Sequence, residues 1–132
     1  MNWQSILKIK NPEGEYWIVT DVDEFTKILR RQLDIFGLKR WTGKSGKESK
    51  SRVVVKETWI SDEILQIVIS VRNPSTQSRE YFRITLKEDD TGDFYYATAL
   101  GPGLELGENE VVANEYEIQN KIIQSVKRVI EG

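Results

Sequence analysis

The stretch Arg52–Arg72, RVVVKETWISDEILQIVISVR, decides the fold because it contains two adjacent segments with the alternating pattern of β-strands. Residues 52–60 are rich in Val and Thr, and residues 64–72 alternate apolar and polar side chains. Residues 61–63 between them are short enough to form a turn. Strands joined in this way normally pair antiparallel, so we predict a β-hairpin here.

Two more strand-like segments follow, at residues 80–87 and 94–100, and extend the hairpin to four strands. The connection EDDTGD, Glu88–Asp93, is rich in carboxylates that resemble a cation site. Its spacing does not fit an EF-hand loop, whereas Asp, Thr and Gly are typical of a turn. We therefore interpret it as a turn and predict no metal site. Gly101–Gly103, GPG, is expected to break the sheet after the fourth of these strands.

Two helices flank the strands. Asp21 is a good N-cap, and apolar side chains recur after it at helical spacing up to Gly37, which is placed to end the helix. The acidic residues of TDVDEF, Thr20–Phe25, are interpreted as capping residues. A final helix is predicted from Glu110 or Asn114 to Glu131.

The start of the chain is ambiguous. Residues 6–10 and 15–20 read as a hairpin around Asn11–Gly14, but Trp3–Lys10 also fits a short helix. With the hairpin, the order is ββ-α-ββββ-α. We predict one α+β domain over residues 1–132, with a mainly antiparallel sheet of five or six strands and both helices on one face.

Composition excludes several chemistries. The 132 residues are 39% hydrophobic and 30% charged, as in a globular domain, and they include no Cys and no His. Thiolate nucleophiles, His-based triads and the usual zinc sites are therefore excluded. No apolar run reaches the ~18 residues of a membrane span, and Lys8 and Lys10 follow rather than precede the first apolar residues. We expect a cytoplasmic protein that is not an enzyme and holds no cofactor.

The stretch GLKRWTGKS, Gly37–Ser45, resembles a phosphate-binding loop but departs from it. Five residues separate Gly37 from Gly43 where that motif has four, and the stretch follows a helix instead of a strand. We reject nucleotide hydrolysis on this basis.

The same region is strongly basic. Residues 39–52 hold six cations against Glu48, within a Gly- and Ser-rich segment that predicts a flexible loop at about 38–51. Cations around a tryptophan suit nucleic acid, because they neutralise phosphates while the ring stacks on a base. The alternative is a solvated basic loop. The candidate nucleic-acid contacts of this run are Lys39, Arg40, Trp41, Lys44, Lys47, Lys50 and Arg52.

Strand alternation adds a second group of candidates. If both helices cover the apolar side of the sheet, the opposite side is open, cationic and dotted with tyrosines. The alternative is an ordinary polar sheet face. The predicted contacts on this side are Arg72, Tyr81, Arg83 and Lys87, with Gln66, Ser70, Thr85 and Tyr95 beside them.

Two other functions stay open. A protein–protein module, such as an adaptor, inhibitor or assembly subunit, would use residues 88–117, which contain nine carboxylates and no Lys or Arg. Its docking loop would be GPGLELGENE, Gly101–Glu110, which otherwise is a connection anchored by Leu104 and Leu106. An enzyme or small-ligand binder would need a pocket between sheet and helices, with a carboxylate such as Glu57. We favour a small non-enzymatic binding protein that contacts nucleic acid, and the protein–protein module is the alternative.

Overall fold

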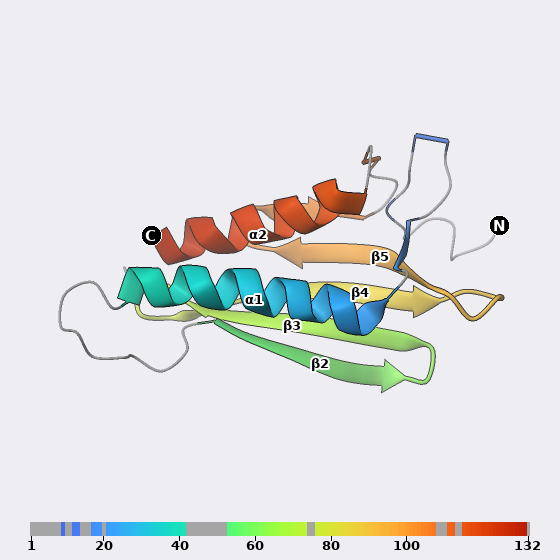
Figure 1. Ribbon diagram of the computed structural model, residues 1–132, viewed down its shortest axis with the longest axis horizontal. Helices are drawn as coiled ribbons and strands as arrows, with labels where there is room; N and C mark the ends of the chain where they lie inside the picture. Colours follow the sequence, from blue (N-terminus) through green and yellow to red (C-terminus); the bar gives the residue numbers. More distant parts are fainter. Residues whose placement is uncertain are drawn as a thin grey trace.

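A computed structural model describes Ile9 and residues 12–13, 17–19, 21–41, 53–73, 76–107, 111–112 and 115–131. For residues 34–41 it describes the backbone alone. The chain forms a curled antiparallel sheet with one early and one C-terminal helix (Figure 1). The α+β architecture predicted from the sequence is thus confirmed.

The four predicted central strands form the body of the sheet, in the order β5-β4-β3-β2. Each pairs antiparallel with its neighbour, as short connections require. Alternation puts the apolar side chains of β3 and β4 on one face, where Leu65, Ile67, Phe82 and Ile84 are fully buried. The strands are β2 (Val53–Ser61), β3 (Ile64–Arg72), β4 (Arg79–Glu88) and β5 (Phe94–Gly101).

The GPG segment does not break the sheet, which corrects the prediction. Pro102 and Gly103 form a two-residue turn, and the chain folds back into a further strand, β6 (Leu104–Leu106), paired with β5. Gly103 has a φ of +72°, which suits the third position of a type II turn after proline. Leu104 and Leu106, the predicted anchors, are both buried on β6, so the strand that follows the turn is packed into the core.

Helix α1 (Val22–Trp41) begins where the sequence predicts and ends later. The Glu24 N–H donates to Asp21 Oδ1 at 3.0 Å, which is the expected N-cap bond. Gly37 does not end the helix. A glycine inside a helix costs about 1 kcal/mol relative to alanine, and α1 is already held to the core by Phe25 and Leu29. Residues 38–41 of the predicted loop therefore belong to α1, and residues 42–51 lie outside the described residues.

Most of the ambiguous N-terminal segment lies outside the described residues. Its described part supplies one strand before α1, β1 (Ile18–Val19), which pairs with the beginning of β5. The Trp17 N–H donates to the Ile9 carbonyl at 3.3 Å, and the Ile9 N–H donates to the Tyr96 carbonyl at 3.0 Å. A backbone bond between Ile9 and Trp17 is what the hairpin interpretation requires.

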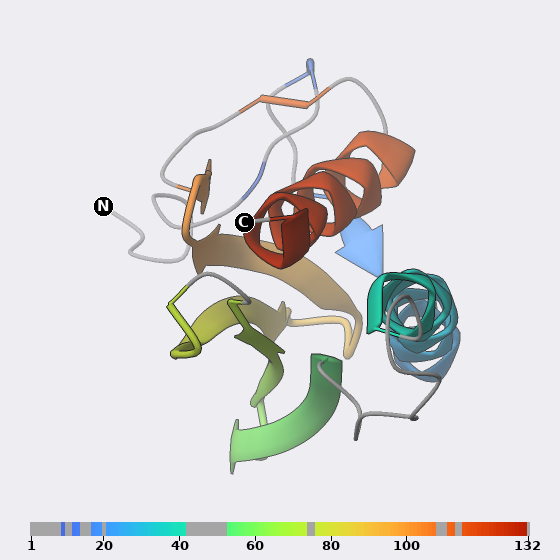
Figure 2. The same cartoon turned by 90° about the vertical axis from the view of Figure 1, so that its left-hand side faces the viewer.

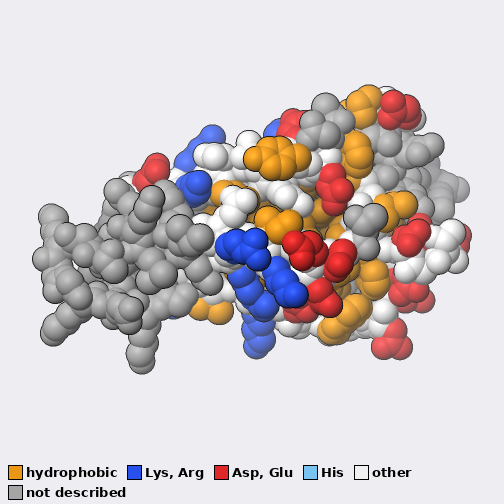
Figure 3. Space-filling model, in the orientation of Figure 1, with side chains coloured by type: hydrophobic (Ala, Val, Ile, Leu, Met, Phe, Trp, Pro, Cys, Tyr) orange, Lys and Arg blue, Asp and Glu red, His pale blue; other side chains and the backbone are white. Residues whose placement is uncertain are grey.

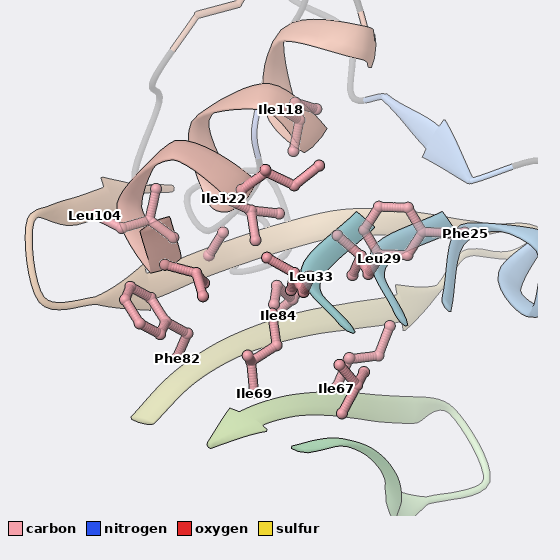
Figure 4. Close-up of a cluster of buried hydrophobic side chains, with 14 of the residues drawn as sticks. Phe25, Leu29, Leu33, Ile67, Ile69, Phe82, Ile84, Leu104, Ile118 and Ile122 are labelled. Carbon is pink, nitrogen blue, oxygen red and sulfur yellow. The ribbon is translucent and has the colours of Figure 1, made fainter. Parts of the chain in front are cut away.

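Helix α2 (Glu115–Glu131) lies beside α1 on the concave face of the sheet (Figure 2). Its apolar stripe, including Ile118 and Ile122, meets Leu33 of α1 and the inward side chains of the strands (Figure 4). The core is thus a single layer between the two helices and one sheet face. The convex face of the sheet has no described helix against it (Figure 2).

Candidate nucleic-acid interface

The basic run predicted as a loop is divided by the structure. Lys39, Arg40 and Trp41 belong to the last turns of α1, so their backbone is helical. The other predicted contacts of this run, Lys44, Lys47, Lys50 and Arg52, lie outside the described residues. The run connects the end of α1 to the start of β2, and both lie at the same end of the molecule (Figure 1).

The second predicted group does come together. Arg72, Tyr81, Arg83 and Lys87 all lie on the convex face, since they alternate with the buried residues of β3 and β4. The register adds two cations that sequence reasoning missed. We call the resulting surface the basic face, defined by Lys56, Arg72, Arg79, Arg83, Lys87 and Tyr81.

Both missed cations carry a signal in the sequence. Arg79 continues the alternation of Tyr81 and Arg83, but the predicted strand begins one residue too late, at Glu80. Lys56 alternates with Val55 and so faces away from the core. Among the residues described on β2 to β6, the convex face carries these five cations and one carboxylate, Glu105.

The cations are arranged in pairs and rows. Arg72 and Arg79 are direct register partners on β3 and β4, and like charges in this position destabilise a sheet. Arg79 Nη1 donates to Ser70 Oγ at 2.8 Å, which holds its guanidinium against the face. Further along, Lys56 and Arg83 lie on either side of Val68 in one cross-strand row. Such an array attracts anions, because no described carboxylate stands between Arg72 and Arg79.

The two tyrosines predicted on the convex face, Tyr81 and Tyr95, differ in exposure. Tyr81 is 49% exposed and offers its ring to solvent. Tyr95 is only 2% exposed, so the expectation of a face dotted with tyrosines is wrong at this position. Burial, aided by the nearby Asp89 carboxylate, raises the pKa of Tyr95. Alternation alone does not reveal such burial, since it assigns a face without saying what covers it.

Carboxylates gather at the end of the molecule opposite to the end of α1 and the start of β2 (Figure 1). The first turns of both helices lie toward the same end as the β2–β3 and β4–β5 turns (Figure 1). The Glu88 N–H donates to the Glu63 carbonyl at 2.8 Å between the two turns. Over the helical side, most Asp and Glu side chains lie toward this end and most Lys and Arg side chains toward the other (Figure 3). We call this region the acidic end; its carboxylates are those of Asp21, Asp23, Glu24, Asp62, Glu63, Glu88, Asp89, Asp90, Asp93, Glu115 and Glu117.

Turn formation accounts for part of this acidity. Asp89 Oδ1 accepts the N–H groups of Thr91 at 2.9 Å and Asp93 at 3.0 Å, and Gly92 has a φ of +88°. These bonds confirm that EDDTGD is a turn. Of the predicted acidic region 88–117, Glu105 lies elsewhere, on β6 of the convex face.

A shallow cavity of about 290 Å³ lies between the first turns of α1 and α2. Phe25, Ile28 and Tyr116 line it together with acidic residues. Behind it, the buried Tyr96 hydroxyl donates to Glu115 Oε1 at 3.0 Å. Burial and this carboxylate raise the pKa of Tyr96. Glu57, the carboxylate named for a small-ligand site, is half-buried on β2 and does not line this cavity.

The tryptophans show two different environments. Trp17 packs against the core, and its indole N–H donates to the Val112 carbonyl at 3.1 Å. Trp59 is 56% exposed near the end of β2, with its ring edge against Phe94 at a centroid distance of 5.7 Å. Trp3 lies outside the described residues, as does the side chain of Trp41.

Neither α1 nor α2 combines the length and the apolar character that crossing a bilayer demands, and these are the helices found in the described part of the chain. Comparison of the chain with protein-family models, with curated proteins and with solved structures finds no match.

Proposed function

We propose that this protein is a small non-enzymatic binding protein that contacts nucleic acid through the basic face, with a contribution from the basic run at residues 39–52. The observation that carries the proposal is the facing pair Arg72 and Arg79 on the convex face of the sheet, against which no described helix packs. Placing two guanidinium groups opposite each other weakens the sheet, and an anion between them reverses that effect.

Overall charge does not argue against this function. The chain has a net charge of −2, but its carboxylates gather at the acidic end and leave one on the described convex face. A polyanion on the basic face therefore meets mostly cations. Association by such contacts releases counterions, so affinity falls steeply with salt.

Fluorescence anisotropy with labelled oligonucleotides at about 50 and 200 mM salt tests the proposal. Four phosphate contacts to a single strand predict a loss of affinity of about 50-fold over this range. The variant Arg79→Glu/Arg83→Glu should abolish binding. Its matched control is Lys27→Glu/Arg31→Glu, which makes the same change in charge on exposed positions of α1.

The outcomes separate the possibilities. Loss in the first variant with retention in the control supports the basic face. Equal weakening in both variants shows binding by overall charge and overturns the assignment of the face. Absence of binding at 50 mM salt overturns the proposed function. The triple variant Lys44→Glu/Lys47→Glu/Lys50→Glu measures the separate contribution of the basic run.

A second candidate is a protein–protein module that uses the acidic end. It is favoured by Tyr116, which is 70% exposed next to the carboxylates of Glu115 and Glu117. A partner here would be a basic protein surface, including the basic face of another copy. Sedimentation equilibrium at low and high salt tests the contact between copies: a self-association that salt dissociates supports it, and a monomer at every salt concentration overturns it.

A further inference from the structure

Tyr81 occupies an unusual position on the basic face. Its same-face neighbours along β4 are Arg79 and Arg83, each about 7 Å away along the strand, and both are exposed. Its register partner on β3 is the small Ser70, and the described register between β4 and β5 begins only at Arg83 and Leu100. The half-exposed phenol ring therefore stands between two exposed arginines along β4, with only a small side chain opposite it on β3.

The neighbouring guanidinium of Arg79 is held in place. Its hydrogen bond to Ser70 Oγ ties it to the same cross-strand position that Tyr81 occupies. A cation that is already positioned loses less conformational freedom when it binds a phosphate. The face thus presents a fixed cation, an aromatic ring and a second cation in sequence along one strand.

We propose that the basic face binds single-stranded nucleic acid, with a base stacked on Tyr81 and the flanking phosphates on Arg79 and Arg83. This inference rests on the proposed function and names the form of nucleic acid. Bases in a duplex are already stacked and paired, and a convex sheet inserts no helix into a groove to read them. A single strand has free π-faces, which aromatic side chains on protein surfaces accept without regard to sequence.

Three labelled probes of equal length test this inference by anisotropy. They are a single-stranded oligothymidylate, the same strand with abasic sites in place of the bases, and a duplex. Base–aromatic stacking predicts that the abasic strand binds between about 5- and 150-fold more weakly than the base-bearing strand. Its backbone charge is unchanged, so electrostatic contacts are the same for both.

Protein variants locate the effect. Tyr81→Ala should remove the preference for the base-bearing strand, and Tyr81→Phe should keep it because the ring remains. Tyr116→Ala is the matched control, since it removes an even more exposed tyrosine at the acidic end. It should leave both affinities unchanged. The comparison of probes on the unaltered protein needs no variant to fold.

The failures of the two proposals are distinguishable. If the base-bearing and abasic strands bind equally, or the duplex binds as tightly as the single strand, the inference is overturned. In that case, salt-dependent binding by the unaltered protein that is lost in Arg79→Glu/Arg83→Glu would still support nucleic-acid binding. If none of the three probes binds at about 50 mM salt, the proposed function itself fails and the inference with it.

Discussion

Replacing Gly101 with alanine tests the packing at the end of β5. A Cβ atom built on Gly101 overlaps Cδ1 of Phe82 and lies 2.8 Å from Cγ and 2.9 Å from Cε1. Phe82 is fully buried, so its ring cannot move out into solvent to make room for the added atom. The backbone of the β5–β6 hairpin therefore packs directly on an aromatic ring, and only glycine permits that approach.

The size of the effect follows from this geometry. Overpacking a core lowers the free energy of unfolding by about 1–3 kcal/mol. Overlap with a buried aromatic ring places Gly101→Ala at the upper end of this range, about 3 kcal/mol. For 132 residues, 1 kcal/mol lowers the Tm by roughly 4 °C. We expect a loss of about 10 °C, with a lower urea midpoint and an unchanged m-value.

Gly103 provides the matched control two residues away. A Cβ atom there meets no atom within 4 Å, but the residue has a φ of +72°. Gly103→Ala therefore carries only the backbone strain of a left-handed residue, about 1 kcal/mol. Urea unfolding followed by circular dichroism compares the two variants.

A double variant identifies the contact. Phe82→Leu removes the ring atoms that alanine at position 101 would meet, and by itself costs about 1 kcal/mol. The double variant should be more stable than the sum of the single effects predicts, by more than about 1 kcal/mol. Strict additivity, or a Gly101→Ala cost no larger than that of Gly103→Ala, would refute the steric argument.

Two further predictions concern buried and edge contacts. Because the pKa of Tyr96 is raised above its ordinary value of 10.0 in the folded protein, the unfolded chain loses this proton first as pH rises. The free energy of unfolding should fall above about pH 10 by up to 1.4 kcal/mol per pH unit, and Tyr96→Phe should flatten the fall in urea unfolding at alkaline pH. Arg30 donates to the Val55 carbonyl at 3.1 Å on β2, the last strand of the described sheet, so Arg30→Ala should promote self-association through β2, measured by sedimentation velocity.

The predictable part of the fold is the part in which one local pattern has one structural solution. Clean alternation in residues 64–72 specified both the strand and its buried face, and the Asp21 N-cap located the start of α1. The predicted helix end at Gly37 and the predicted break of the sheet at GPG were wrong, because a glycine permits several backbone conformations without requiring one. In the first case the helical backbone continues through Gly37 to Trp41. In the second, Leu104 and Leu106 had burial to gain by folding back on β5.

The candidate site shows the same division between pattern and packing. Alternation brought Arg72, Tyr81 and Arg83 to one face without reference to any distant residue. It could not reveal that Arg72 faces Arg79, because cross-strand partners depend on register, which the connecting turn sets. The same register gives the site its function in our proposal. A single cation on a sheet is ordinary solvated surface, whereas two facing cations beside an exposed ring form a surface that an anion with a stacking group stabilises.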